Sequence, residues 1–143
     1  MDRSRREFIK KSCGICASIV GISMLAASLD SCTPLQYVSA EISNGKISVA
    51  KNKFVEGTSL LILKHPSLEY NIALVKSGEN SFRAFELKCT HQDNSLVATN
   101  SGFHCSLHGS SYSTEGKVSN GPATTNLKEY STSVVNENVE ISL

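Results

Sequence analysis

Two cysteines and three histidines lie within 24 residues of the chain, in the stretch CTHQDNSLVATNSGFHCSLHGSSY at positions 89–112. The whole chain of 143 residues has only five cysteines and four histidines. Cys89 and His91 form a C-x-H pair, and Cys105 and His108 form a C-x-x-H pair. Each pair is close enough in sequence for both side chains to reach one site from a tight loop. We therefore predict two facing loops that together supply two thiolates and two imidazoles.

This donor set is typical of two kinds of metal centre. Two Cys and two His hold zinc tetrahedrally, and they also hold a diiron cluster in which two His replace two Cys on one iron. In zinc fingers the cysteines come as one pair and the histidines as another, whereas here each loop supplies one of each. The order Cys, His, Cys, His favours a cluster with two different irons.

The rest of the chain is predicted to be one small antiparallel β domain, residues 36–143. Its length allows one modest domain and is too short for two ordinary ones. Short runs with a period of two are separated by Gly and Asn, and no convincing helical period follows residue 34. The β-like runs are 47–50, 60–63, 70–75, 82–87 and 139–143. Asn44-Gly45 and residues 136–138 are the expected turns beside the first and last of them.

Residues 1–32 are predicted to be an export signal or a membrane anchor. A basic segment leads into an apolar run, residues 12–29, and residues 4–10, SRREFIK, resemble the twin-arginine signal. The run of 18 residues is near the lower limit for a bilayer-spanning helix, which needs about 20. Lys10 and Lys11 before it predict a cytoplasmic N-terminus and a body on the outer, periplasmic or extracytoplasmic side.

The end of the signal segment leaves two kinds of membrane attachment open. Residues 29–32, LDSC, resemble a lipoprotein cleavage site, which would place a lipid on Cys32. An uncleaved anchor is the other reading, and release after cleavage is less favoured. Beyond this segment, residues 33–143 carry nine basic and ten acidic residues, so no electrostatic footprint for nucleic acid is present.

The two loops resemble the cluster-binding loops of the Rieske family of 2Fe–2S proteins, at residues 89–91 and 105–110. The resemblance implies that Cys89 and Cys105 ligate an inner iron and that His91 and His108 ligate an outer, more exposed one. It also implies a 2Fe–2S cluster as cofactor and a small antiparallel Rieske-like β-sandwich as the fold.

Two further segments bear on this resemblance. Residues 121–127, GPATTNL, look like the proline-containing loop that covers the cluster in the family. His104 adjoins Cys105 but fits neither loop motif, and on a strand its side chain would point to the opposite face. His65 precedes Pro66 in an expected turn. Neither histidine is predicted to belong to the site.

The residues around the ligands indicate an intermediate reduction potential. Ser110 and Tyr112 match positions whose hydroxyls, in high-potential Rieske proteins, bond a bridging sulfide and a ligand Cys sulfur. Such donors stabilise the reduced cluster and raise the potential within the family range of about −150 to +300 mV. High-potential members of cytochrome bc-type complexes also carry a disulfide between the loops. Asn94 and Leu107 stand at those positions, so that bridge cannot form.

The resemblance implies a one-electron carrier without a complete catalytic site of its own. The favoured role is the iron–sulfur subunit of an extracytoplasmic, membrane-bound redox complex, either quinol–cytochrome reductase-like or molybdenum-oxidase-like. Its redox partner would be a cytochrome b or c or a molybdenum oxidase subunit, and quinol would be reached through such a complex. The alternatives are a stand-alone Rieske ferredoxin that feeds an oxygenase and a zinc-stabilised cell-surface binding module.

Overall fold

The structure is a computed structural model, and it describes residues 34–143. This part of the chain consists of strands and one short 3-10 helix, η1 (Lys51–Lys53), so the predicted all-β class is confirmed. None of the helices in the described residues is long and apolar enough to cross a membrane. The predicted signal or anchor at residues 1–32, with its twin-arginine motif and Cys32, lies outside the described residues. The boundary before residue 36 therefore stays a prediction.

A five-stranded sheet with the order β1-β4-β5-β6-β11 is the largest of three sheets in the described residues. Its strands are β1 (Gln36–Ser39), β4 (Leu60–Lys64), β5 (Ile72–Lys76), β6 (Phe82–Glu86) and β11 (Glu129–Tyr130). Four of these strands form antiparallel pairs, whereas β1 runs parallel to β4. A parallel pair needs a long crossover, and residues 40–59 supply it by passing through another sheet.

Both faces of this five-stranded sheet are buried. Leu60 and Ile62 of β4 belong to one hydrophobic cluster, whereas Leu61 and Leu63 belong to a second one. Successive side chains of a strand point to opposite faces, so the two clusters lie on opposite faces of the sheet. Burial on both faces explains why this strand is a continuous apolar run without the polar positions of a half-exposed strand.

A four-stranded sheet, β12-β13-β3-β2, forms around the second cluster. Its strands are β2 (Ile42–Ser43), β3 (Lys46–Ala50), β12 (Thr132–Val135) and β13 (Asn138–Ser142). Asn44 and Gly45 join β2 to β3 with φ of 51° and 72°, as a two-residue hairpin of the predicted kind requires. Asn136, with φ of 52°, begins the matching turn between β12 and β13. Both predicted turns are confirmed.

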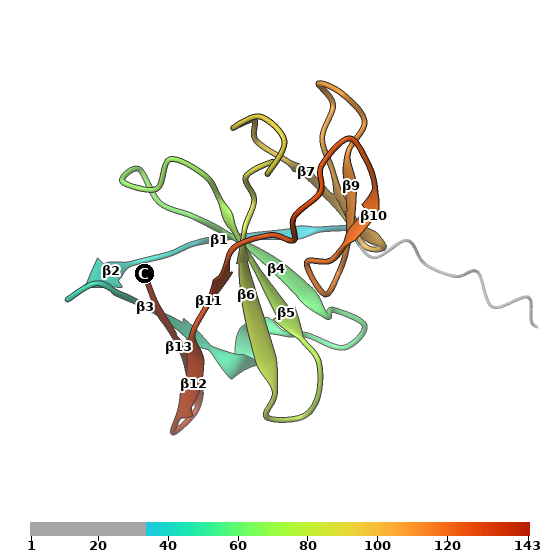
Figure 1. Ribbon diagram of the computed structural model, residues 1–143. Helices are drawn as coiled ribbons and strands as arrows, with labels where there is room; N and C mark the ends of the chain where they lie inside the picture. The colour runs from blue at the N-terminus through green and yellow to red at the C-terminus, as the bar shows by residue number, and fades with distance from the viewer. Residues whose placement is uncertain (1–33) are drawn as a thin grey trace, which may run out of the picture. The chain divides into compact units, whose positions relative to one another are not determined.

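The sheet that carries the candidate site is β10-β9-β8-β7, at the upper right of Figure 1. Its strands are β7 (Val97–Thr99), β8 (Gly102–His104), β9 (Ser111–Ser113) and β10 (Val118–Asn120). Phe103 of β8 and Tyr112 of β9 are buried in the first cluster, together with Cys89 and Cys105. The site residues therefore share one core with the five-stranded sheet.

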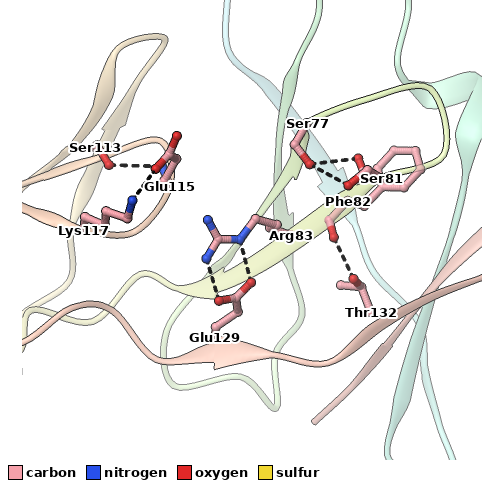
Figure 2. A network of polar contacts seen from close by, with 9 residues as sticks. All are labelled: Ser77, Ser81, Phe82, Arg83, Ser113, Glu115, Lys117, Glu129 and Thr132. Atoms are coloured by element: carbon pink, nitrogen blue, oxygen red, sulfur yellow. Dashed lines mark hydrogen bonds and ion pairs between the residues drawn. The ribbon is translucent and has the colours of Figure 1, made fainter.

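Polar contacts attach the C-terminal strands to β6 (Figure 2). Arg83 of β6 forms two hydrogen bonds of 2.7 Å with the carboxylate of Glu129 on β11. The Thr132 hydroxyl donates to the backbone oxygen of Phe82 at 2.7 Å. These bonds hold in place the segment that follows the predicted covering loop, residues 121–127.

Candidate functional site

Two loops on neighbouring elements hold the predicted ligands. The first loop, residues 87–96, connects β6 to β7, and the second loop, residues 105–110, connects β8 to β9. The Cys89 N–H donates to the Asn94 oxygen at 2.8 Å, and the Cys105 N–H donates to the Ser110 oxygen at 2.8 Å. Gly109 has φ of 82°, a left-handed conformation that favours glycine where the second loop turns back. Each cysteine thus sits in a turn closed by its own backbone.

The structure separates the four predicted ligands into two pairs by burial. The Cys89 and Cys105 side chains belong to the core, each 1% exposed. His91 and His108 are exposed, and their ring centroids lie 5.1 Å apart with an interplanar angle of 82°. A pair of buried thiols and a pair of exposed imidazoles fit a cluster with one inner and one outer iron.

Hydrogen bonds around Cys89 favour its thiolate. Burial opposes ionisation, but the backbone N–H groups of Gln92 and His91 donate to the sulfur, as do the side chains of Tyr112 and Cys105. These donors outweigh burial and lower the pKa of the Cys89 thiol to about 7. An iron ligand must be a thiolate, so the site favours the form that binds metal.

Ser110 is fully buried, and its hydroxyl oxygen accepts the Ala123 N–H at 3.0 Å. With that oxygen engaged as an acceptor, the hydroxyl proton remains available for donation to another group. The bond also attaches the predicted covering loop, residues 121–127, to the second loop. Ala123 and Leu127 of the covering loop are buried in the same cluster as the two cysteines.

The Tyr112 hydroxyl has two neighbours that can take its proton. Its oxygen lies 3.7 Å from the Cys89 sulfur and 2.9 Å from the Thr90 hydroxyl oxygen. It also accepts the Thr90 N–H at 3.0 Å, and the Thr90 hydroxyl donates to the Thr125 oxygen at 2.7 Å. Sequence reasoning missed Thr90, although its place between two predicted ligands is a signal that it lies at the site.

Asn94 and Leu107 stand at the predicted positions of the disulfide cysteines of high-potential Rieske proteins, and their surroundings differ. The Asn94 side-chain amide donates to the Cys105 sulfur at 3.7 Å and to the Ser95 oxygen at 3.2 Å. Leu107 is 55% exposed beside His108. Cys89 and Cys105 are both free within residues 34–143. Sequence reasoning treated Asn94 only as a missing cysteine, and its polar side chain was the signal that it could serve as a donor.

The remaining histidines form hydrogen bonds with residues other than the predicted ligands. His104 ends β8 with an exposed side chain, and its Nδ1 lies 3.1 Å from the Ser111 hydroxyl oxygen. His65 precedes a turn, where its Nδ1 accepts the Ser67 N–H at 3.0 Å. Within residues 34–143, no group of three or more His, Cys, Asp or Glu side chains gathers around a single-ion position.

Residues 36–131 match the family model described as Rieske [2Fe-2S] domain. The chain belongs to the Rieske family. Its cofactor is a 2Fe–2S cluster, and it is a Rieske electron carrier. The two buried thiols and two exposed imidazoles described above provide the donor types that such a cluster needs.

The chain is similar in sequence to part of another protein. Over 74 residues the chain is 39% identical to "Cytochrome b6-f complex iron-sulfur subunit" of Synechococcus sp. (strain CC9605). That match covers 48% of this chain and 41% of the relative, so the chain spans about two fifths of that protein.

Two solved structures show the fold at low identity. The plasma membrane Rieske protein PetC3 from Synechocystis PCC 6803 has 24% identity and a TM-score of 0.55, over 67% of this chain and 98% of that one. A chain in the complex of reduced oxygenase and oxidized ferredoxin in carbazole 1,9a-dioxygenase has 18% identity and a TM-score of 0.52, over 70% and 94%. The predicted Rieske-like fold is confirmed.

Proposed function

We propose that this Rieske protein is the iron–sulfur subunit of an extracytoplasmic, membrane-bound redox complex. The observation that carries the proposal is the separation of the predicted ligands into a buried thiol pair and an exposed imidazole pair. The exposed imidazoles are the part of the proposed site that a partner can contact, so electrons would pass to the partner through them. The catalytic surface would belong to that partner.

In this proposal Cys89 and Cys105 bind the inner iron, and His91 and His108 bind the outer one. When bound, the cluster takes up and returns one electron. The core around the cysteines excludes water, which holds the thiolates in a low-dielectric environment.

Ser110 and Tyr112 are proposed to raise the reduction potential by donating to sulfur. The support is that Ser110 is fully buried with its oxygen engaged by Ala123, and that the Tyr112 hydroxyl approaches the Cys89 sulfur. Thr90 shares the Tyr112 hydroxyl at the shorter distance of 2.9 Å. This sharing is a reason to expect an intermediate potential.

The cellular location and the redox partner of the protein are inferred from its N-terminus and from one relative. The twin-arginine-like segment supports export of the folded domain, followed by attachment through residues 1–32 or through a lipid on Cys32. Similarity to a cytochrome b6-f subunit favours a quinol–cytochrome reductase-like complex with a cytochrome b or c as partner. A molybdenum oxidase subunit is the other partner consistent with the sequence.

An oxygenase-feeding ferredoxin is the second candidate function. The similarity in fold to the ferredoxin–oxygenase complex of carbazole 1,9a-dioxygenase is compatible with it. The twin-arginine-like segment and the Ser110–Tyr112 pair favour the complex subunit instead. The zinc module differs from both because it would be colourless and redox-inactive.

The test begins with the folded chain purified under conditions that retain metal. We expect two irons and two sulfides per chain, visible absorption that bleaches on reduction, and an electron paramagnetic resonance signal of the reduced protein. One zinc per chain with no such signal would overturn the cluster proposal. The ligand assignment is then tested with two substitutions, Cys89→Ser and His108→Ala. Both should lose the signal, whereas the matched control His104→Ala should keep it.

Membership of a complex is tested on native membranes. Affinity purification of the full chain from mildly solubilised membranes should recover a cytochrome or a molybdenum protein as a stoichiometric partner. The reduced-state signal of the chain should also appear when quinol is added to these membranes, if the complex is of the quinol–cytochrome type. Recovery of a monomeric chain in the soluble cytoplasmic fraction would favour the ferredoxin alternative.

A further inference from the structure

Asn94 is a side chain of the first loop that reaches the cysteine of the second loop. Its backbone oxygen accepts the Cys89 N–H at 2.8 Å. Its side-chain Nδ2 lies 3.7 Å from the Cys105 sulfur, within the range of a hydrogen bond to sulfur. Asn94 therefore bonds to both cysteines, to one through its backbone and to the other through its amide.

The orientation of the amide is determined by a second bond. An asparagine Nδ2 has two N–H donors. One donates to the Ser95 oxygen at 3.2 Å, which leaves the other for the Cys105 sulfur. The backbone around Asn94 is also held, because its N–H donates to the Gln92 oxygen within the same turn.

We propose that Asn94 is a positioning residue that joins the two loops and raises the reduction potential through its N–H bond to the Cys105 sulfur. The proposal rests on the proposed role of Cys105 as an iron ligand. It gives Asn94 a function at a position where sequence comparison indicated only that a disulfide cysteine is missing.

The physical reason is a difference between two redox states. Uptake of one electron makes the cluster and its thiolate sulfurs more negative, with no bond broken. An N–H donor then interacts more strongly with the sulfur, because hydrogen bonds to charged acceptors are about twice as strong as neutral ones. Cys105 is 1% exposed, so little water competes for its sulfur. The bond thus stabilises the reduced form more than the oxidised form.

Asn94→Leu tests this directly, because leucine has a similar shape and no donor. We expect the equilibrium constant for one-electron reduction to fall about threefold to tenfold, which is about 30–60 mV at 59 mV per tenfold for one electron. Asn94→Asp keeps the shape but places a negative charge beside the sulfur, so its potential should fall further. Asn80→Leu is the matched control. Asn80 lies in the turn between β5 and β6, and its side-chain oxygen accepts a hydrogen bond from the Lys51 ammonium. Its potential should stay at the wild-type value.

A measurement on the unsubstituted protein covers the case in which a variant fails to retain its cluster. Pulsed electron paramagnetic resonance of the reduced wild-type holoprotein, labelled with ¹⁵N in asparagine, should show a weak coupling from a side-chain amide nitrogen. A wild-type potential in Asn94→Leu, or an absent asparagine coupling, would overturn the proposal while leaving the cluster assignment intact. Absence of any reduced-state signal in the wild-type protein would instead overturn the proposed function.

Discussion

The hydroxyl of Tyr112 lies 2.9 Å from the hydroxyl of Thr90 and 3.7 Å from the sulfur of Cys89. Thr90 uses its own proton on the Thr125 oxygen at 2.7 Å, so its oxygen acts as an acceptor toward Tyr112. The single proton of Tyr112 therefore has a hydroxyl acceptor that competes with the sulfur. This relationship makes Thr90 a determinant of how strongly Tyr112 can stabilise a reduced cluster.

Thr90→Val should raise the reduction potential, because it removes the hydroxyl acceptor and leaves the Tyr112 proton to the Cys89 sulfur. We expect about a threefold change in the reduction equilibrium, about 30 mV for one electron, measured by redox titration of the holoprotein. Thr90→Ser retains the hydroxyl and is the matched control with a wild-type potential. In a Tyr112→Phe background, Thr90→Val should have no such effect. A rise that persists without the tyrosine hydroxyl would contradict this explanation.

Ser110→Ala should lower both the reduction potential and the stability. The substitution removes the hydroxyl proposed to donate into the site, and it leaves the buried Ala123 N–H without its acceptor. An unpaired buried donor costs about 1–3 kcal/mol, which chemical denaturation of the apoprotein can measure. Ser111→Ala is the neighbouring control, because Ser111 bonds exposed His104. An unchanged potential in Ser110→Ala would show that its proton is not donated to the cluster.

The sequence predicted the fold class correctly because that class depends on local patterns, and the predicted ligand pairs rest on a local pattern of the same kind. Apolar runs and Asn or Gly turns mark strands such as β3, β4 and β13, and a metal motif places its ligands close together by spacing alone. Strands of the site sheet, such as β7 and β10, were missed. They are three residues long and mostly exposed, so they have little apolar periodicity. Their position depends on pairing with neighbours that are themselves short.

The contacts of Asn94 and Thr90 could not be predicted, because they depend on how the loops face each other. Asn94 meets Cys105 across 11 positions, and Thr90 meets Thr125 across 35. No pattern within either segment indicates such a distant partner. The parallel pairing of β1 with β4 is of the same kind, since its crossover passes through a different sheet.

Gly102→Ala should disturb the site through the backbone. Gly102 has φ of 148°, and a Cβ there would overlap with the backbone oxygen of Tyr112 on the paired strand β9. We expect a loss of about 2–4 kcal/mol in the free energy of unfolding, with a lowered reduction potential as Tyr112 moves. Gly45→Ala is the control, because its Cβ would meet no atom within 4 Å and only its φ of 72° opposes alanine. That variant should lose about 1–2 kcal/mol and keep its potential.

Glu129→Gln should destabilise the protein at neutral pH and much less in acid. The hydrogen bond from Arg83, which outweighs burial, lowers the pKa of the Glu129 carboxyl below its ordinary value of 4.5. Because the folded pKa is lower than the unfolded one, this carboxylate contributes stability above the unfolded pKa and loses it as pH falls through the folded pKa. Both side chains are partly exposed, at 34% and 43%, so water screens the pair. The expected loss at pH 7 is therefore below about 1 kcal/mol.

Urea denaturation of Glu129→Gln from pH 7 down to below the ordinary pKa of 4.5 measures this loss as a function of pH. The control is Glu56→Gln, which changes a carboxylate in an exposed turn. A loss from Glu129→Gln that grows on acidification would contradict the lowered pKa.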